Sequence, residues 1–181
     1  MDILVGLSFL PFSSFPPGTV YEIIKSSYSL FPALLTKEDA WIRLDNEIYS
    51  TNTHSDIGGF IAALDNEPVG VILWQIDREG ETATITQCSI SLSHQKKGYG
   101  SAMLEEAIRR LSLSGIKSIE SKTYQRFVGS CRLFDKHNFT FVSLSREEDL
   151  SLGLGVGVNY LHIIGKKLQR PKKLRKKWNI F

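Results

Sequence analysis

Apolar and polar positions along this chain follow two spacings, one typical of strands and one typical of helices. Apolar residues at helical spacing follow Thr19 and Thr36, and each threonine opens a capping-box sequence with an acidic residue three positions later. Two more helices are predicted, one that starts close to Gly100 and stops at Gly115, and one over Phe127–His137. Strands are predicted over the following segments: Asp2–Phe12, Gly59–Leu64, Val69–Ile76, Thr82–Leu92, Ile116–Tyr124, Phe139–Leu144 and Asn159–Ile164. The order β-α-α-β-β-β-α-β-α-β-β indicates a mixed α/β (α+β) domain.

One stretch carries the clearest chemistry, and it reads I-S-L-S-H-Q-K-K-G-Y-G-S-A-M-L-E-E-A-I-R-R-L from Ile90 to Leu111. It begins as the end of a strand and continues as an amphipathic helix that starts close to Gly100. The first amides of such a helix have no partner within the helix. Together with the helix dipole they form an anion site, and glycines let a phosphate approach the backbone. Lys96 and Lys97 add positive charge beside this turn.

Two well-known phosphate-binding motifs do not fit this turn. There is no G-x-x-x-x-G-K-[ST] sequence, and Met103 stands where the dinucleotide motif G-x-G-x-x-G has its third glycine. An ordinary glycine-containing turn between a strand and a helix is the alternative. The preceding strand, Gln95, the two lysines and the well-formed helix together favour phosphate binding.

Composition limits the class of protein. The chain has 181 residues, of which 42% are hydrophobic and 23% are charged, as expected for one globular domain with a real core. Two cysteines imply no disulfide framework and fit a reducing compartment, so we expect a cytoplasmic protein. The apolar N-terminus carries Asp2 and no basic residue, which argues against a signal peptide. No apolar run approaches the roughly 18 residues of a membrane span, so no membrane contact is expected.

The charge is unevenly distributed. Residues 166–181 contain eight of the 22 lysines and arginines and no acidic residue, which leaves 14 basic against 19 acidic residues in the rest. The chain therefore combines an acidic body, residues 1–165, with a basic C-terminal tail. We expect the tail to contact polyanions without reading sequence, because runs of like charge are usually interaction tails. A tail that only improves solubility is the alternative.

The Q-x-x-G-x-G sequence of residues 95–100 resembles motif A of the GNAT (GCN-related N-acetyltransferase) superfamily, whose signature is [Q/R]-x-x-G-x-[G/A]. The resemblance implies the acyl-CoA N-acyltransferase fold over residues 1–165, a twisted mixed sheet with helices on both faces. It also implies a splayed pair of strands, one ending near Leu92 and the other starting near Ile116, with acetyl-CoA bound between them as co-substrate. The residues implied for this binding are Ser89, Ile90 and Ser91 along the pantetheine, and Gln95, Lys96, Lys97, Gly98, Tyr99, Gly100 and Ser101 around the pyrophosphate, with amides from Tyr99 and Ser101.

A second landmark agrees with the resemblance but departs from it at two positions. The sequence L-F-D-K-H-N-F, residues 133–139, is similar to the family's L-Y-E-K-x-G-F. Phe134 stands where many members have the tyrosine proposed to protonate the leaving thiolate, and Asn138 replaces a glycine that ends the helix. Thr84 occupies the position of the catalytic glutamate of the histone-modifying branch. The family's acid and one of its bases are therefore absent.

Other groups must then move the protons. Strand alternation puts Tyr160 and His162 on one face, and they point away from a packed helix if Leu161 lies on the helix side. We expect His162 and Glu120 as base candidates and Tyr160 as an acid candidate; a half-buried strand histidine with no role is the alternative for His162. The four histidines have no metal-ligand spacing, so no metal is expected. For Cys88 we favour a buried packing residue over an acyl-carrying nucleophile.

The resemblance implies an N-acetyltransferase that moves an acetyl group from acetyl-CoA to a primary amine of a small molecule or peptide by direct attack. The alternatives are a catalytically silent module that binds CoA or a polyanion, and an acetyltransferase of a ribosomal or nucleoid protein anchored by the tail. A monomer or a homodimer fits either reading. The sequence does not name the amine; we expect specificity to come from the first two helices and a hairpin at Gly153–Gly157.

Overall fold

The structure is a computed structural model that describes residues 6–31, 34, 36–50, 57–145 and 156–165. Parts of three predictions lie outside these residues: the start of the first strand, most of the hairpin at 153–157 and the whole basic tail at 166–181. Among the described residues, none of the helices combines the length and the apolar character that a membrane span needs.

A seven-stranded sheet forms the centre of the domain, in the order β1-β2-β3-β4-β5-β7-β6. The strands are β1 (Leu7–Leu10), β2 (Ile57–Leu64), β3 (Glu67–Asp77), β4 (Thr82–Ile90), β5 (Ser118–Tyr124), β6 (Thr140–Ser145) and β7 (Gly157–Ile163). All neighbouring strands are antiparallel except β4 and β5, which are parallel because α4 (Tyr99–Leu113) connects them as a crossover. The predicted mixed sheet is confirmed, and its strand ends differ from the predicted ones by a few residues.

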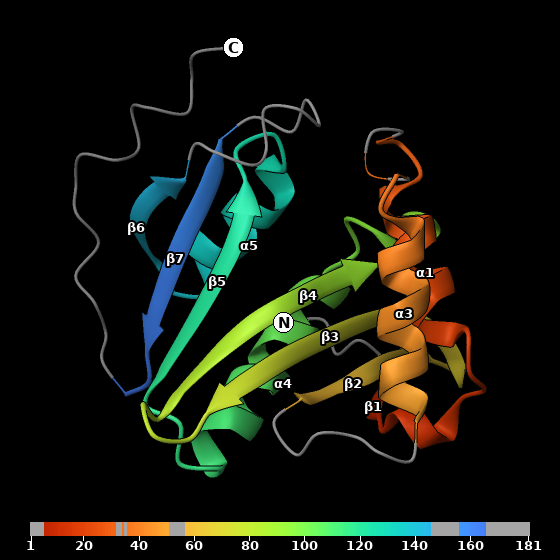
Figure 1. Ribbon diagram of the computed structural model, residues 1–181, viewed down its shortest axis with the longest axis horizontal. Coiled ribbons are helices and arrows are strands. Elements are labelled where there is room, and N and C mark those ends of the chain that lie inside the picture. Colours follow the sequence, from red (N-terminus) through yellow and green to blue (C-terminus); the bar gives the residue numbers. More distant parts are fainter. Residues whose placement is uncertain (1–5, 32–33, 35, 51–56, 146–155, 166–181) are drawn as a thin grey trace.

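Helices cover both faces of the sheet, as predicted (Figure 1). On one face, α1 (Thr19–Tyr28) and α3 (Glu38–Tyr49) pack their apolar residues against β2 and β3, with Ile24 and Trp41 in the resulting core. On the other face, α4 and α5 (Val128–Lys136) form a second core, in which Met103 and Phe134 are buried. The two cores explain why the central strand β3 reads as a run of buried residues rather than an alternating one.

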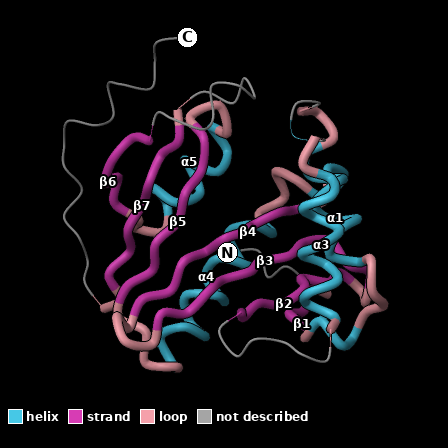
Figure 2. Tube along the Cα trace, in the orientation of Figure 1, coloured by secondary structure: helices cyan, strands magenta, loops and turns pink. Residues whose placement is uncertain are grey.

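The sheet opens between β4 and β5. These strands pair only from Thr82 with Ser118 to Ile85 with Ser121, and beyond this point their register ends. Figure 2 shows the two strands meeting at one end and diverging toward the other, with α1 and α5 on opposite sides of the gap. A bulge in β4 lies where the pairing ends, because Gln87 faces Leu73 and Ile85 faces Trp74, which leaves Thr86 without a partner in β3. The predicted splay of these two strands is confirmed.

The start of α1 differs from the prediction. Thr19 does not cap the helix; its hydroxyl donates to the carbonyl of Pro16. Instead, the buried carboxylate of Asp45, on α3, accepts hydrogen bonds from the amides of Gly18 and Tyr21, at 2.7 and 3.0 Å. The capping-box prediction was wrong because Asp45, which is distant in sequence, binds the amides at the start of the helix in place of Thr19. This contact also joins α3 to α1.

Candidate functional site

The turn between β4 and α4 is held in place by Gln95. Its side-chain amide donates to the carbonyl of Ile90 at 3.0 Å and to the carbonyl of Ser27, at the end of α1, at 3.3 Å. The signature glutamine therefore fastens the turn to two neighbouring elements, and its side chain is already engaged within the protein. The sequence motif identified Gln95 as a residue of this turn, but the motif could not predict its contact with Ser27 on α1.

Gly98 lies at the start of α4 in the left-handed region, with φ of 89°, which favours glycine. A Cβ atom at this residue would meet no described atom within 4 Å, so the backbone here is open to solvent. The amides of Tyr99 and Gly100 donate to no acceptor among the described residues, whereas the amide of Ser101 donates back to the carbonyl of Gly98 at 3.0 Å. The anion site thus offers the first two amides of the helix, and the amide predicted at Ser101 is already used.

The side chain of Ser101 joins α4 to the end of α5. Its hydroxyl accepts a hydrogen bond from the ammonium of Lys136 at 2.8 Å and lies 2.6 Å from Nε2 of His137. Burial lowers the pKa of His137, so this imidazole is held in its neutral form. Sequence reasoning missed both residues, because they lie 35 and 36 positions from Ser101. Lys136 places a further positive charge beside the open amides of α4.

The edge of β4 that faces β5 carries unpaired backbone groups. The amide of Ser91 donates to the carbonyl of Val69, and in a regular antiparallel ladder every second residue repeats this direction. Following the register back from Ser91, the backbone groups of Ser89 face β3, while those of Cys88 and Ile90 face the gap. Because the pairing with β5 ends at Ile85, the groups of Cys88 and Ile90 have no strand partner.

The predicted pantetheine contacts fall on this edge in part. Ile90 presents its backbone to the gap, although its carbonyl accepts from Gln95. The side chain of Ser89 points the other way, toward α1, where its hydroxyl lies 3.1 Å from that of Ser27. Lys96 and Lys97 are exposed beside the turn. The cofactor contacts predicted for Ile90, Lys96 and Lys97 stay predictions.

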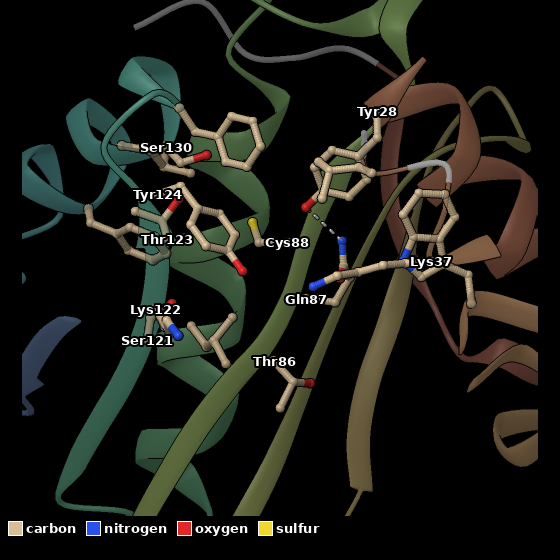
Figure 3. A pocket seen from close by; sticks show the side chains of 16 residues that line it. Tyr28, Lys37, Thr86, Gln87, Cys88, Ser121, Lys122, Thr123, Tyr124 and Ser130 are labelled. Carbon is tan, nitrogen blue, oxygen red and sulfur yellow. Dashed lines mark hydrogen bonds between the residues drawn. The ribbon is translucent and has the colours of Figure 1, made fainter. Parts of the chain in front are cut away.

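A cavity of about 290 Å³ fills the gap between the splayed strands (Figure 3). Four aromatic rings line the cavity in series: Trp41 stacks on Tyr28 at 5.6 Å, Tyr28 lies 5.8 Å from Phe127, and Phe127 lies 5.6 Å from Tyr124. The remaining lining residues are Leu34, Lys37, Ile85, Thr86, Gln87, Cys88, Ser121, Lys122, Thr123, Ser130, Leu133 and Phe134. The fold brings these four rings together from separate elements of the chain.

Two phenols of the wall are candidates for proton transfer. The hydroxyl of Tyr28 accepts a hydrogen bond from the side-chain amide of Gln87 at 3.3 Å, which leaves its own proton to donate. Burial raises the pKa of Tyr28, so this phenol stays protonated at neutral pH. Figure 3 shows the hydroxyl of Tyr124 pointing across the cavity toward Cys88. Neither residue follows a motif, so sequence reasoning missed both.

Cys88 lines the cavity with its thiol. Burial raises the pKa of this thiol to about 12, so the thiolate is scarce at neutral pH. The structure therefore favours the packing role expected for Cys88 over nucleophilic chemistry, and it leaves the backbone amide of Cys88 as the group available to a ligand.

The predicted proton carriers do not converge on the cavity. Tyr160 and His162 lie on the sheet face that α5 covers, where Tyr160 is 2% exposed and its ring lies 5.3 Å from that of Phe134. Leu161 lies on the opposite face, so the condition under which the pair would point away from a helix is not met. Burial lowers the pKa of His162 and raises that of Tyr160. Glu120 is exposed on the face of Leu161, and none of the three lines the cavity.

No metal centre emerges from the titratable residues. Within the described ranges, no three histidine, cysteine, aspartate or glutamate side chains are grouped so that they could hold a metal ion.

Comparison with known proteins agrees with this geometry. Residues 19–139 match the sequence profile of the acetyltransferase (GNAT) family. No curated protein sequence matches the chain significantly. Among solved structures, the PaiA N-acetyltransferase from Thermoplasma acidophilum in complex with coenzyme A superposes with a TM-score of 0.67 at 18% identity, over 84% of this chain and 97% of that one.

Two further solved structures share the fold. The ribosomal-protein-S18-alanine N-acetyltransferase from Escherichia coli has a TM-score of 0.68 at 17% identity, over 90% of this chain and 97% of that one. The Microcin C7 self immunity acetyltransferase MccE, in complex with acetyl-CoA and AMP, has a TM-score of 0.70 at 16% identity, over 88% of this chain and 93% of that one. At these identities the likeness establishes the arrangement of helices and strands.

Proposed function

Because this chain belongs to the GNAT acetyltransferase family, we propose that it transfers an acetyl group from acetyl-CoA to a primary amine of a small molecule or a peptide. The observation that carries the proposal is the unpaired edge of β4, which runs from the open amides of Tyr99 and Gly100 to the cavity. A long ligand with an anionic middle and a reactive end fits such a path. The solved relatives with bound coenzyme A or acetyl-CoA support acetyl-CoA as that ligand.

The turn would hold the pyrophosphate. Two amides without acceptors, the positive end of a 15-residue helix and the exposed ammonium groups of Lys96, Lys97 and Lys136 all favour a negative charge there. Gly98 leaves the approach open. Along β4, the backbone groups of Cys88 and Ile90 would take the place of a missing strand for the amides of the pantetheine, as an added strand does at any open sheet edge.

The reaction is direct attack. The neutral amine nitrogen bonds to the thioester carbonyl carbon and the carbonyl oxygen becomes an oxyanion. The nitrogen, now cationic, loses a proton to water, and the carbon–sulfur bond breaks to give the amide and a thiolate. The backbone amide of Cys88 points toward the gap from β4 and is placed to donate to the oxyanion. The protein would chiefly bring the two reactants together and stabilise the charge, since burial raises the pKa of the Cys88 thiol to about 12 and so disfavours the thiolate that a covalent intermediate would need.

The thiolate must gain a proton, and Phe134 has no hydroxyl to give. We assign this role to the phenols of the cavity wall. Tyr28 keeps its proton while it accepts from Gln87, and Tyr124 points toward Cys88 from the other side (Figure 3). The roles predicted for His162, Glu120 and Tyr160 stay predictions, and their placement away from the cavity does not support them.

The test is release of free CoA thiol from acetyl-CoA with a panel of amines. We expect turnover with at least one amine and a loss of about tenfold or more in kcat for Tyr28→Phe or Tyr124→Phe, within the range typical of a general acid. The variant that removes the acid should still bind acetyl-CoA, in calorimetry, with an affinity within about twofold of wild type. Tight acetyl-CoA binding without turnover of any amine would favour the catalytically silent module instead.

A further inference from the structure

A short series of polar side chains connects the cavity to α1. The side-chain amide of Gln87, on β4, donates to the hydroxyl of Tyr28 at 3.3 Å and also to the hydroxyl of Ser89. Ser89 is 3% exposed, and its hydroxyl lies 3.1 Å from that of Ser27, which donates to the carbonyl of Ile24 at 2.8 Å. Both hydrogens of the Gln87 amide nitrogen are therefore used, and the amide is anchored between the cavity and α1.

The contact with Gln87 determines what the phenol of Tyr28 can do. A phenol oxygen that accepts a hydrogen bond from an amide keeps its own hydrogen to donate. Figure 3 shows the hydroxyl of Tyr28 facing the cavity, with the bond from Gln87 drawn to it. The ring is held as well, because it stacks on Trp41 at 5.6 Å and lies 5.8 Å from the ring of Phe127. Three neighbours therefore fix the position of a phenol whose proton is left for a ligand.

From this arrangement we infer that Tyr28, rather than Tyr124, is the general acid of acetyl transfer, and that Gln87 is a positioning residue that acts through Tyr28. The inference rests on the proposed function and distinguishes the two phenols named there. In this step the O–H bond of Tyr28 breaks and its proton bonds to the sulfur of the departing thiolate, so CoA leaves as the free thiol. The phenolate that remains takes a proton from solvent water before the next turnover.

Gln87 contributes most when negative charge develops on the phenol oxygen. A hydrogen bond to a charged oxygen is stronger than one to a neutral oxygen, so donation from Gln87 stabilises the phenolate more than the phenol. The pKa of Tyr28 reflects both influences, because burial raises it and the hydrogen bond from Gln87 lowers it. Ser89 supports this role by accepting the second amide hydrogen, which keeps the nitrogen of Gln87 directed toward Tyr28.

The test is a double-mutant cycle on kcat, measured as release of free CoA thiol with an amine that the wild type acetylates. Gln87→Met keeps the size of the side chain and removes the donor, so kcat should fall about tenfold. The Kd of acetyl-CoA and the KM of the amine should stay within about threefold of wild type, because Gln87 acts in the transition state. Gln87→Glu should lower kcat further, since its carboxylate accepts the proton that Tyr28 must give. In the Tyr28→Phe background, Gln87→Met should change kcat by less than about twofold, because the hydroxyl through which Gln87 acts is absent.

Two further variants control for structural effects. Gln75→Met makes the same substitution at an exposed residue of β3 outside the cavity, and it should leave kcat unchanged. Ser89→Ala retains Gln87 and removes only the acceptor of its second hydrogen, so kcat should fall about threefold, and this loss should also disappear in the Tyr28→Phe background. Melting temperatures measured in parallel show which variants are folded.

The outcomes separate this inference from the proposed function. An unchanged kcat in both Gln87 variants would overturn the inference while acetyl transfer itself stands. The same holds for an equal loss from Gln87→Met with and without the hydroxyl of Tyr28, and for a loss that Tyr124→Phe causes and Tyr28→Phe does not. Absence of turnover with every amine would overturn the proposed function as well.

Discussion

Two matched substitutions at Gly98 separate the phosphate-binding role of the turn from its structural role. Gly98→Asp adds a carboxylate at the start of α4, next to the open amides of Tyr99 and Gly100, and Gly98→Asn adds a neutral group of the same size. Both side chains tolerate the left-handed backbone at this position better than other residues do. A Cβ atom meets nothing within 4 Å, so neither variant creates a clash in the free protein.

The magnitudes follow from this geometry. Backbone strain at φ of 89° costs each variant about 1 kcal/mol, which lowers the melting temperature by about 2–4 °C in a chain of this size. The charge acts only in the aspartate variant. Two unit charges about 4 Å apart repel by about 4 kcal/mol at an effective dielectric constant of about 20, and screening at physiological salt reduces this to about 3 kcal/mol. The aspartate variant should therefore bind acetyl-CoA about a hundredfold more weakly than the asparagine variant.

The assay is calorimetric titration of acetyl-CoA into the three proteins, with melting temperatures measured in parallel. We expect the two variants to melt within about 2 °C of each other and to differ in acetyl-CoA affinity, with a difference that shrinks as salt is added. If both variants bind acetyl-CoA as tightly as wild type does, the placement of the pyrophosphate at this turn is refuted. A shared weakening would mean that bulk, rather than charge, decides access to the backbone.

Three further predictions follow from other contacts. Gln95→Met leaves the carbonyls of Ile90 and Ser27 without their donor, so it should lower the free energy of unfolding by about 1–3 kcal/mol and the melting temperature by several degrees. The control Gln75→Met, at an exposed residue, should change the melting temperature little, and equal melting temperatures of the two variants would contradict the anchoring role of Gln95. Burial lowers the pKa of His162 in the folded state, so the free energy of unfolding should fall as the pH drops below the unfolded-state pKa of about 6.5. The melting temperature of wild type should therefore fall more between pH 7.5 and 5.5 than that of His162→Gln, and parallel pH profiles would contradict this. A chain ending at Gly165 should lose retention on immobilised RNA and DNA at low salt, because eight of the basic residues lie in 166–181, and retention of the full chain should fall steeply with salt; unchanged retention after truncation would leave the tail without this role.

The sequence alone determined the order of elements and the position of the turn. Apolar spacing after Gly100 located α4, and Gln95 and Gly98 identified the turn before it, because helix periodicity and a left-handed glycine are local properties. Asn138, which replaces the family's helix-ending glycine after α5, has a left-handed backbone with φ of 62°, a conformation that asparagine tolerates. The parallel pair of strands follows from the same local pattern, since a strand, a helix and a strand in succession form a crossover.

Only the tertiary structure decided which side chains meet. Asp45 caps α1 from α3, and Gln95 binds α1 as well as β4; both contacts join elements that are distant along the chain. The local sequence pattern carries no information about such distant partners, so the capping box at Thr19 was predicted in place of the true cap. The surroundings of Tyr160 and His162 could not be predicted for a similar reason, because alternation places both residues on one face but does not say which face α5 covers.

The cavity shows most clearly what could not be predicted from the sequence. Tyr28, Lys37, Lys122 and Tyr124 come from the end of one helix, the start of another and the far half of a strand, and none belongs to a motif. They meet because β4 and β5 stop pairing after Ile85 and because α1 and the start of α3 lie beside the resulting gap. The cofactor turn is encoded in consecutive residues and could be identified from the sequence, since backbone amides at one helix end bind the phosphate. The cavity is assembled from side chains of separate elements, so its charge and shape exist only once the sheet has formed.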